Sequence, residues 1–326
     1  MRKWISVIVT VLLLAGGVVL CAVRWQAWFG VPPAPKWTGD TINYVFSLPS
    51  ADSIQPSELT VLVLGDVHNR LTREDYDSLA ARVPQRDLVA QTGDWLERGQ
   101  DYYYRLLLRE WTESALAGTP VIACPGNHEY SKGLQKSLSP VWENAFNQAT
   151  PESAVYPIED VPGASCYIDL QDVRFIVIDT NPLVRLVWLT RTLTWLREAM
   201  YSAGNRYVVV LMHHPVLSPG KGRFNPLIYA TFRHALSEAD LVIAGHDHSY
   251  MRRTPFVVLN TAGKTKPQLI DFPVEATDTV PVYGVLTVNR SGQPCDEAIR
   301  RQSGMTLTIH RMSDGTAIDS LHVSHD

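Results

Sequence analysis

Five short apolar runs along this chain are each followed at once by side chains that bind divalent metals. Each run has the length and composition of a buried strand. The residues that follow the runs are Asp66 and His68, then Asp94, then Asn127 and His128, then His213, and finally His246 and His248. Because open α/β sheets place their sites at the carboxyl ends of strands, we expect these side chains to share one edge.

The donor set indicates a catalytic metal site. It combines carboxylate, amide and imidazole groups, and no cysteine lies in a ligating turn. This mixture suits Mn, Fe or Zn and argues against a structural zinc site. A single carboxylate can bridge two ions about 3.5–4 Å apart, and Asp94 is the natural bridge. Two such ions with a bridging hydroxide suit in-line displacement at phosphorus.

Composition and charge exclude some other classes of function. The chain has 326 residues, of which 45% are hydrophobic and 19% charged, as in a globular domain with a sizeable core. The formal net charge of −4 gives no indication of nucleic-acid binding. Four scattered cysteines do not form a disulfide framework, although a Cys166–Cys295 bridge stays open outside the cytoplasm.

The amino terminus predicts a membrane segment. Arg2 and Lys3 precede an apolar run, Trp4 to Val23, that would span roughly 30 Å as a helix. The alternative is a signal peptide cleaved near Ala15, but more apolar sequence follows that position. We favour an uncleaved signal anchor, and the two basic residues place the amino terminus inside the cell.

This interpretation divides the chain into three parts. Residues 1–24 form the anchor, residues 25–57 form a linker, and residues 58–326 form the catalytic domain. The linker contains Pro32-Pro33-Ala34-Pro35, which is typical of a stiff spacer. The domain would then lie outside the cytoplasm, in the periplasm or at the cell surface.

Hydrophobic periodicity predicts alternating strands and helices, then a run of antiparallel strands. The predicted strands are 59–64, 87–91, 120–124, 165–170, 173–179, 207–212, 241–244, 282–288, 305–309 and 318–323. The predicted helices are 72–83, 101–117, 187–202 and 226–239. Thr72 and Asp75 resemble a capping box, and Gly118 is expected to end the second helix. Residues 131–163 are expected to form a partly helical insertion.

The ordered motifs resemble those of calcineurin-like metallophosphoesterases. The matching blocks are Asp66-x-His68, Gly93-Asp94, Gly126-Asn127-His128-Glu129, His213 and Gly245-His246-Asp247-His248. The resemblance covers roughly Leu59 to Asp326. It implies an α/β fold, a four-layer α-β-β-α sandwich of two mixed sheets flanked by helices.

The same resemblance implies a role for each site residue. One ion would be held by Asp66, His68, Asp94 and His248. The other would be held by Asp94, Asn127, His213 and His246. His128 would stand near the leaving oxygen as general acid.

Two local resemblances concern the neighbourhood of this site. Gly93 to Gly99 is similar to a block of the serine/threonine phosphoprotein phosphatases, which implies that Glu97 orients the catalytic histidine and Arg98 grips phosphate. The alternative for Arg98 is that it has no contact with phosphate and is simply a solvent-exposed arginine at the start of a helix. Gly245 to Arg252 is similar to purple acid phosphatases, but His68 and Glu97 depart from their pattern. The charge-transfer colour of that group is therefore not expected.

The leading hypothesis is a membrane-anchored phosphohydrolase that cleaves phosphate mono- or diesters by attack of a metal-bridging hydroxide, with His128 as general acid. The alternative is an inactive, membrane-tethered metal-binding or scaffold module of the same fold. Catalytically inactive members of such a family usually lack some of the metal ligands, whereas every expected metal ligand is present in this chain. His214, which follows a predicted ligand, either contacts substrate or ligands or packs beside Pro215.

Overall fold

The computed structural model describes residues 46–47, 58–130, 137–146, 155–158, 164–170, 172–184, 186–218, 232–270, 272–289 and 304–324. The predicted anchor, most of the predicted linker, Cys21 and Cys295 lie outside these ranges. Among the described residues, no helix combines the length and apolar character needed to cross a membrane. Cys124 and Cys166 are free thiols.

One mixed sheet has six strands in the order β14-β13-β12-β1-β2-β3. Its three parallel strands carry the first motifs, and its three antiparallel strands come from the end of the chain. The strands are β1 (Glu58–Leu64), β2 (Leu88–Gln91), β3 (Val121–Ala123), β12 (Val282–Asn289), β13 (Gly304–Arg311) and β14 (Ala317–Val323).

The second mixed sheet has eight strands in the order β11-β9-β10-β8-β7-β6-β5-β4. Strands β6, β7, β8 and β10 run parallel, and the outer strands pair antiparallel. The strands are β4 (Val155–Pro157), β5 (Cys166–Leu170), β6 (Val173–Ile178), β7 (Tyr207–Met212), β8 (Leu241–Ala244), β9 (Tyr250–Arg253), β10 (Phe256–Val258) and β11 (Ala276–Asp278).

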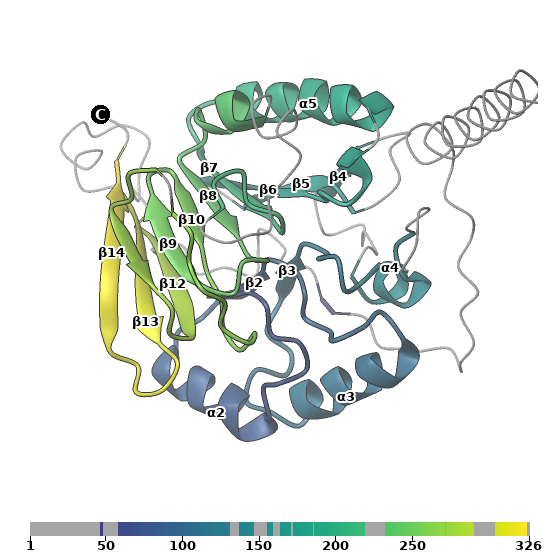
Figure 1. The fold of residues 1–326 in the computed structure, drawn as a ribbon, viewed down its shortest axis with the longest axis vertical. Coiled ribbons are helices and arrows are strands. Elements are labelled where there is room, and N and C mark those ends of the chain that lie inside the picture. Colours follow the sequence, from purple (N-terminus) through teal and green to yellow (C-terminus); the bar gives the residue numbers. More distant parts are fainter. Residues whose placement is uncertain are drawn as a thin grey trace, which may run out of the picture.

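Helices cover the outer faces of both sheets, which confirms the predicted four-layer sandwich (Figure 1). Helices α2 (Arg73–Arg82), α3 (Asp101–Thr112) and α4 (Pro140–Phe146) pack on the six-stranded sheet. Helix α5 (Leu186–Tyr201), preceded by the 3-10 turn η2 (Pro182–Val184), packs on the other sheet.

The strand pattern explains this layering. Strand β1 is apolar on both faces, so that Val61 and Val63 enter the core between the sheets while Leu62 and Leu64 face the helices. Strand β6 repeats the arrangement in the second sheet, where Phe175 joins the central core. Strands β1 and β6 are therefore buried on both faces.

An ionic contact joins the two sheets at their far edges. Asp319 on β14 accepts hydrogen bonds from Arg252 Nε at 2.6 Å and Arg252 Nη2 at 3.0 Å. It also accepts one from the buried Tyr250 hydroxyl. Both donors lie on β9, so this carboxylate fixes the end of the second sheet against the first.

Several details differ from the sequence prediction. Helix α3 ends at Thr112 rather than at residue 117, and the chain continues in turns to Gly118, whose φ is +79°. Strands β4, β9, β10 and β11 were not predicted. The Thr72–Asp75 capping box is confirmed. Of the predicted 226–239 helix, residues 232–236 are helical and residues 237–239 form a turn and a bend, while residues 226–231 lie outside the described part.

Phe46, which lies within the predicted linker, packs into the domain. Its side chain is buried and stacks on Phe146 with ring centroids 4.4 Å apart. It also contacts the rings of Trp95 and Trp111. The Phe46 N–H donates to the Ala145 carbonyl at 2.9 Å. This part of the linker segment is therefore joined to the core beneath the six-stranded sheet.

Candidate metal centre and active site

The structure brings the predicted ligands together at the carboxyl ends of five strands. Asp66 and His68 follow β1, Asp94 follows β2, and Asn127 and His128 follow β3. From the second sheet, the loops after β7 and β8 supply the rest. These are His213, His246 and His248.

The first group of ligand atoms belongs to Asp66, His68, Asp94 and His248. One donor atom from each lies within 4.8 Å of the others, and all four residues are buried. His68 Nε2 lies 3.1 Å from His248 Nε2 and 3.6 Å from Asp94 Oδ2. His248 Nε2 lies 3.8 Å from Asp66 Oδ1. These are the four residues that the family resemblance implies for one ion.

The second group is arranged around His213. Its Nε2 atom lies 3.2 Å from Asn127 Oδ1, 3.3 Å from His246 Nδ1 and 3.3 Å from Asp94 Oδ2. Its other ring nitrogen contacts the Thr92 carbonyl at 3.0 Å. Asp94 Oδ2 therefore lies between the two groups, within 3.6 Å of His68 and 3.3 Å of His213.

The polar atoms of this cluster fit metal ions. Asp66 Oδ2 is buried without a hydrogen-bond partner in the described part of the chain. Imidazole nitrogens face each other in the pairs His68–His248 and His213–His246. Since buried polar atoms are normally satisfied, such a concentration of lone pairs is typical of a site for cations. The two groups share Asp94, so the donor set suits two ions.

Burial and mutual charge determine the protonation of the metal-free cluster. Burial raises the pKa of Asp66 to about 8. Burial alone would lower the pKa of His213, but the Asp94 carboxylate outweighs it and raises this pKa to about 9. Burial lowers the pKa of His68 and of His246 to about 3. Two of the predicted ligands therefore hold protons near neutral pH, and metal binding must displace them.

The backbone of the ligating loops is strained. Asp66, His68, Asp94, His246 and His248 all have φ between +51° and +73°. Residues other than glycine rarely adopt this left-handed conformation, and such strain clusters at functional sites. Hydrogen bonds hold the loops in place, among them those from the Asp66 N–H to the Gly93 carbonyl at 3.1 Å and from the His68 N–H to the Asp94 carbonyl at 2.9 Å.

Glu129 holds the loops after β2 and β3 together. Its fully buried carboxylate accepts hydrogen bonds from the N–H groups of Asp94 at 3.0 Å, Leu96 at 2.9 Å and Gly126 at 2.7 Å. Burial, aided by the charge of Asp94, raises its pKa to about 7. Glu129 belongs to the motif Gly126-Asn127-His128-Glu129, but no role was predicted for it.

A glycine is required at position 126, because the loops after β2 and β3 approach each other closely there. A Cβ atom at this position would lie 2.2 Å from Asp94 Oδ1. The Gly126 backbone is also supported by Asn181, whose amide donates to the Gly126 carbonyl at 3.3 Å. Asn181 in turn is bonded to the buried Asp179 carboxylate at 3.1 Å. No signal in the sequence pointed to Asp179 or Asn181.

His128 points one ring nitrogen at the cluster. Its Nδ1 contacts the Glu97 backbone carbonyl at 2.5 Å, and its Nε2 lies 3.9 Å from Asp94 Oδ2. A carbonyl only accepts, so Nδ1 carries a proton. Nε2 is then the atom that can gain or release a proton. The His128 N–H also donates to Asp94 Oδ1 at 2.9 Å, which links this histidine to the shared carboxylate.

The structure places the Glu97 side chain beside the first group of ligand atoms. The Glu97 carboxylate lies 3.6 Å from His68 Nδ1 and 3.9 Å from Arg70 Nη2. Its contact with His128 comes from the backbone carbonyl and not from the side chain. Arg98 is exposed to solvent. The arrangement thus connects the Glu97 carboxylate with a predicted metal ligand.

His214 lies beside the second ligand group. Its Nδ1 atom is 2.6 Å from Thr180 Oγ1, and its ring centroid is 4.4 Å from that of His246. One donor atom each of His213, His214 and His246 lies within 4.8 Å of the others. Of the two alternatives for His214, this geometry favours contact with the ligands.

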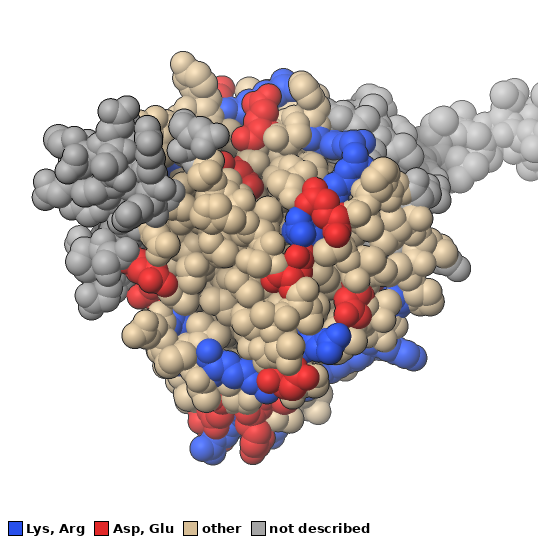
Figure 2. Space-filling model, turned by 90° about the vertical axis from the view of Figure 1, so that its left-hand side faces the viewer, with Lys and Arg blue, Asp and Glu red and all other residues tan. Residues whose placement is uncertain are grey.

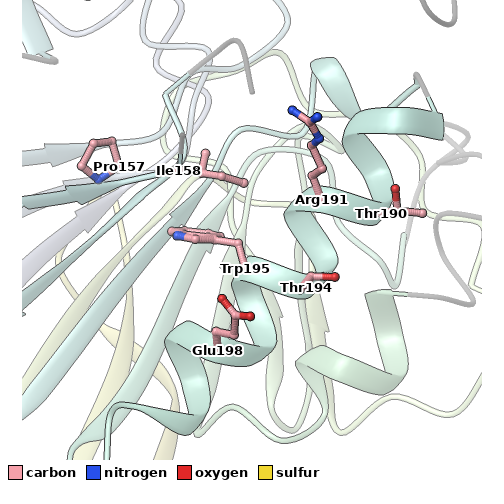
Figure 3. A pocket seen from close by; sticks show the side chains of 7 residues that line it. All are labelled: Pro157, Ile158, Thr190, Arg191, Thr194, Trp195 and Glu198. Carbon is pink, nitrogen blue, oxygen red and sulfur yellow. The ribbon is translucent and has the colours of Figure 1, made fainter. Parts of the chain in front are cut away.

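A separate pocket lies away from this cluster. It has a volume of about 590 Å³ and opens between the end of β4 and helix α5 (Figure 3). Its lining residues are Pro157, Ile158, Thr190, Arg191, Thr194, Trp195 and Glu198. None of them is a predicted site residue. On the face drawn in Figure 2, acidic and basic side chains of the described residues are interspersed.

Two mixed sheets bring carboxylate, amide and imidazole donors together at the carboxyl ends of their strands, which is the arrangement of a two-metal protein. Residues 59–250, more than half of the chain, match the family model of the calcineurin-like phosphoesterases. The chain belongs to this family.

One curated relative is the glycerophosphodiester phosphodiesterase GpdQ of Enterobacter lignolyticus. It is 25% identical over 171 residues, which are 50% of this chain and 56% of the relative. The chain therefore matches little more than half the length of that protein.

Solved structures share the fold at low sequence identity. A purple acid phosphatase from yellow lupin has a TM-score of 0.59 and 14% identity over 83% of this chain and 55% of its own. A dimetal phosphatase from Danio rerio has a TM-score of 0.54 and 12% identity, and the match covers 82% of this chain and 99% of that protein. GAP50, described as the anchor in the inner membrane complex of Plasmodium, has a TM-score of 0.54 and 12% identity. This match covers 83% of this chain and 90% of GAP50.

Proposed function

We propose that this protein is a dinuclear metal-dependent phosphohydrolase that cleaves phosphate mono- or diesters. The observation that carries the proposal is the position of Asp94 Oδ2 between two groups of donor atoms, with His128 Nε2 3.9 Å away. One group is Asp66, His68 and His248, and the other is Asn127, His213 and His246. Mn, Fe and Zn all suit this donor set.

Two bound divalent ions would lower the pKa of water and neutralise charge on a phosphate oxygen. The protein supplies the remaining functions. Glu129 and the strained loops keep the donor atoms in position. His128 Nε2, when protonated, donates to the leaving oxygen as general acid. The Glu97 carbonyl keeps the proton of neutral His128 on Nδ1 and thereby orients the ring.

The relative GpdQ supports diesters as one substrate class, because its name describes a phosphodiesterase. Exposed Arg98 is the proposed contact for a second phosphate oxygen, since a guanidinium can form two parallel hydrogen bonds. The loops around the site determine which ester fits.

A test of this proposal uses the full-length protein in detergent. The protein would be stripped of metal, reloaded with Mn²⁺, and assayed with p-nitrophenyl phosphate and bis(p-nitrophenyl) phosphate. We expect two ions per chain and hydrolysis of at least one ester, both abolished by a chelator. Two bound ions without turnover of either ester would contradict the proposal.

That outcome would favour the second candidate, a tethered binding or scaffold module. The observation in its favour is that GAP50, with the same fold, is described as an anchor. Against it stands the complete set of ligand types, together with His128, in this chain.

We also propose that Trp4 to Val23 anchors the domain outside the cytoplasm, in the periplasm or at the cell surface. The support is the apolar length of this segment and the two basic residues before it. A protease added to cells with a permeabilised outer layer should release the domain. A domain that stays protected until the inner membrane is lysed would reverse the orientation.

A further inference from the structure

A short segment between β10 and β11 packs directly against the metal centre. His248 Nδ1 contacts the Lys264 carbonyl at 2.7 Å, and the Lys266 N–H donates to the His248 carbonyl at 3.3 Å. A Cβ atom on Gly263 would lie 3.0 Å from His248 Nδ1 and 3.1 Å from Asp66 Cβ. The backbone of residues 263–266 is therefore held close to two predicted ligands.

This packing brings the ammonium group of Lys266 to the rim of the centre. Its Nζ atom donates to the His246 carbonyl at 3.0 Å, and Lys266 is exposed to solvent. An ammonium has three donors, and the carbonyl uses one of them.

We propose that Lys266 binds a non-bridging oxygen of the substrate phosphate and favours dianionic monoesters over monoanionic diesters. This inference rests on the proposed function. At pH 7 a phosphate monoester carries a charge of about −1.5 to −2, whereas a diester carries a single negative charge. Because Coulomb attraction scales with charge, a fixed cation at the rim stabilises the bound monoester more.

The test compares Lys266→Met, which removes the charge, with Lys266→Arg, which keeps it. Lys264→Met is the matched control, because it removes the same charge from the same segment and keeps the carbonyl that contacts His248. For each variant, the two p-nitrophenyl esters give kcat and KM, and calorimetry gives the Kd of inorganic phosphate for the Mn²⁺-loaded protein. Metal content is measured in parallel.

We expect Lys266→Met to keep both ions and to raise the Kd of phosphate and the KM of the monoester about tenfold, as for loss of a hydrogen bond to a charged group. The KM of the diester should rise less, kcat should change little, and Lys266→Arg should restore most of the affinity. Lys264→Met should resemble the wild type.

Three results would overturn the inference. The first is an unchanged phosphate Kd in Lys266→Met, and the second is an equal loss of phosphate affinity in Lys264→Met. The third is loss of metal from Lys266→Met, which would mean that Lys266 supports the loop of His246 instead of binding phosphate. Failure of the proposed function is a different result. If the wild type hydrolyses neither ester, the phosphate Kd of the same variants still decides whether Lys266 binds the anion.

Discussion

At the scale of single residues, the two donor groups depend on one carboxylate. Asp94 Oδ2 faces His68 and His213, while Asp94 Oδ1 accepts the His128 N–H. Burial would raise the pKa of Asp94, but the surrounding imidazoles outweigh burial and hold this pKa below its ordinary value. Asp94 is therefore ionised and able to serve both groups, whereas the Asp66 carboxylate belongs to the first donor group and contacts the second only through the backbone N–H of His246.

Asp94→Asn should accordingly remove more metal than Asp66→Asn. An amide has one good oxygen donor and no charge, so the change weakens both ion positions, whereas Asp66→Asn weakens one. Metal content per chain would be measured on purified protein after dialysis. Two ions still bound in Asp94→Asn would exclude the bridging role.

His128→Asn should separate binding from chemistry. Asparagine can still donate to the Glu97 carbonyl, so we expect both metals to stay bound. Loss of a general acid typically costs 10²–10⁴-fold in rate. Alkyl phosphate esters, whose leaving groups need a proton, should lose that much, and nitrophenyl esters should lose far less. Equal losses on both ester types would show that His128 binds substrate or supports metal instead.

At the scale of elements, the strand-end loops are held by a side chain rather than by the sheet. Glu129 joins the turn after β3 to the loop after β2 through three backbone N–H groups. In Glu129→Ala these buried donors lose their partner, at about 1–3 kcal/mol each. We therefore expect the free energy of unfolding to fall by roughly 3 kcal/mol or more.

Urea denaturation followed by tryptophan fluorescence would measure this loss, with Glu113→Ala as control because Glu113 is exposed at the end of α3. Glu129→Gln keeps one oxygen acceptor and should lose less. A Glu129→Ala variant as stable as the control would mean that other contacts position the loops.

The elements that carry the ligands could be predicted because each is a continuous apolar run buried on both faces. The bounds of β7 and β8 agree with the sequence prediction residue by residue. Strand β9 could not be predicted, because half of it is arginine and its pairing depends on the distant Asp319. Glu129 was missed for a similar reason, since its partners are backbone groups that leave no mark in the sequence.

At the scale of the whole molecule, metal binding should couple to pH. In the metal-free protein, burial raises the pKa of Asp66 to about 8, and Asp94 outweighs burial to raise that of His213 to about 9. Below these values the ligands hold protons that compete with metal. The apparent affinity should therefore increase as pH rises towards 8, about tenfold per pH unit for each displaced proton.

Calorimetry with Mn²⁺ at pH 6, 7 and 8, in buffers of different ionisation enthalpy, would measure the affinity and the protons released. An affinity that stays constant over this range would show that neither group is protonated in the metal-free protein.

Phe46 should contribute to the stability of the entire domain. Its side chain is 2% exposed and contacts Phe146, Trp95 and Trp111. Phe46→Ala should lower the free energy of unfolding by about 3–5 kcal/mol, as for other buried aromatic residues. Tyr201→Ala, at a position 91% exposed, is the control and should change little. A loss below 1 kcal/mol would mean that the Phe46 contact is only marginal.

With the proposed anchor in place, the docking of Phe46 would also limit the distance between the candidate active site and the membrane. Between Arg24 and Phe46 lie about 20 residues, which span at most roughly 70 Å when fully extended. With Trp4 to Val23 in a bilayer, the segment between Arg24 and Phe46 would tether the domain to the membrane, and its point of attachment would lie beneath the six-stranded sheet. It would sample a shallow layer of solution over the membrane, and substrates confined to that layer would meet it at a high local concentration.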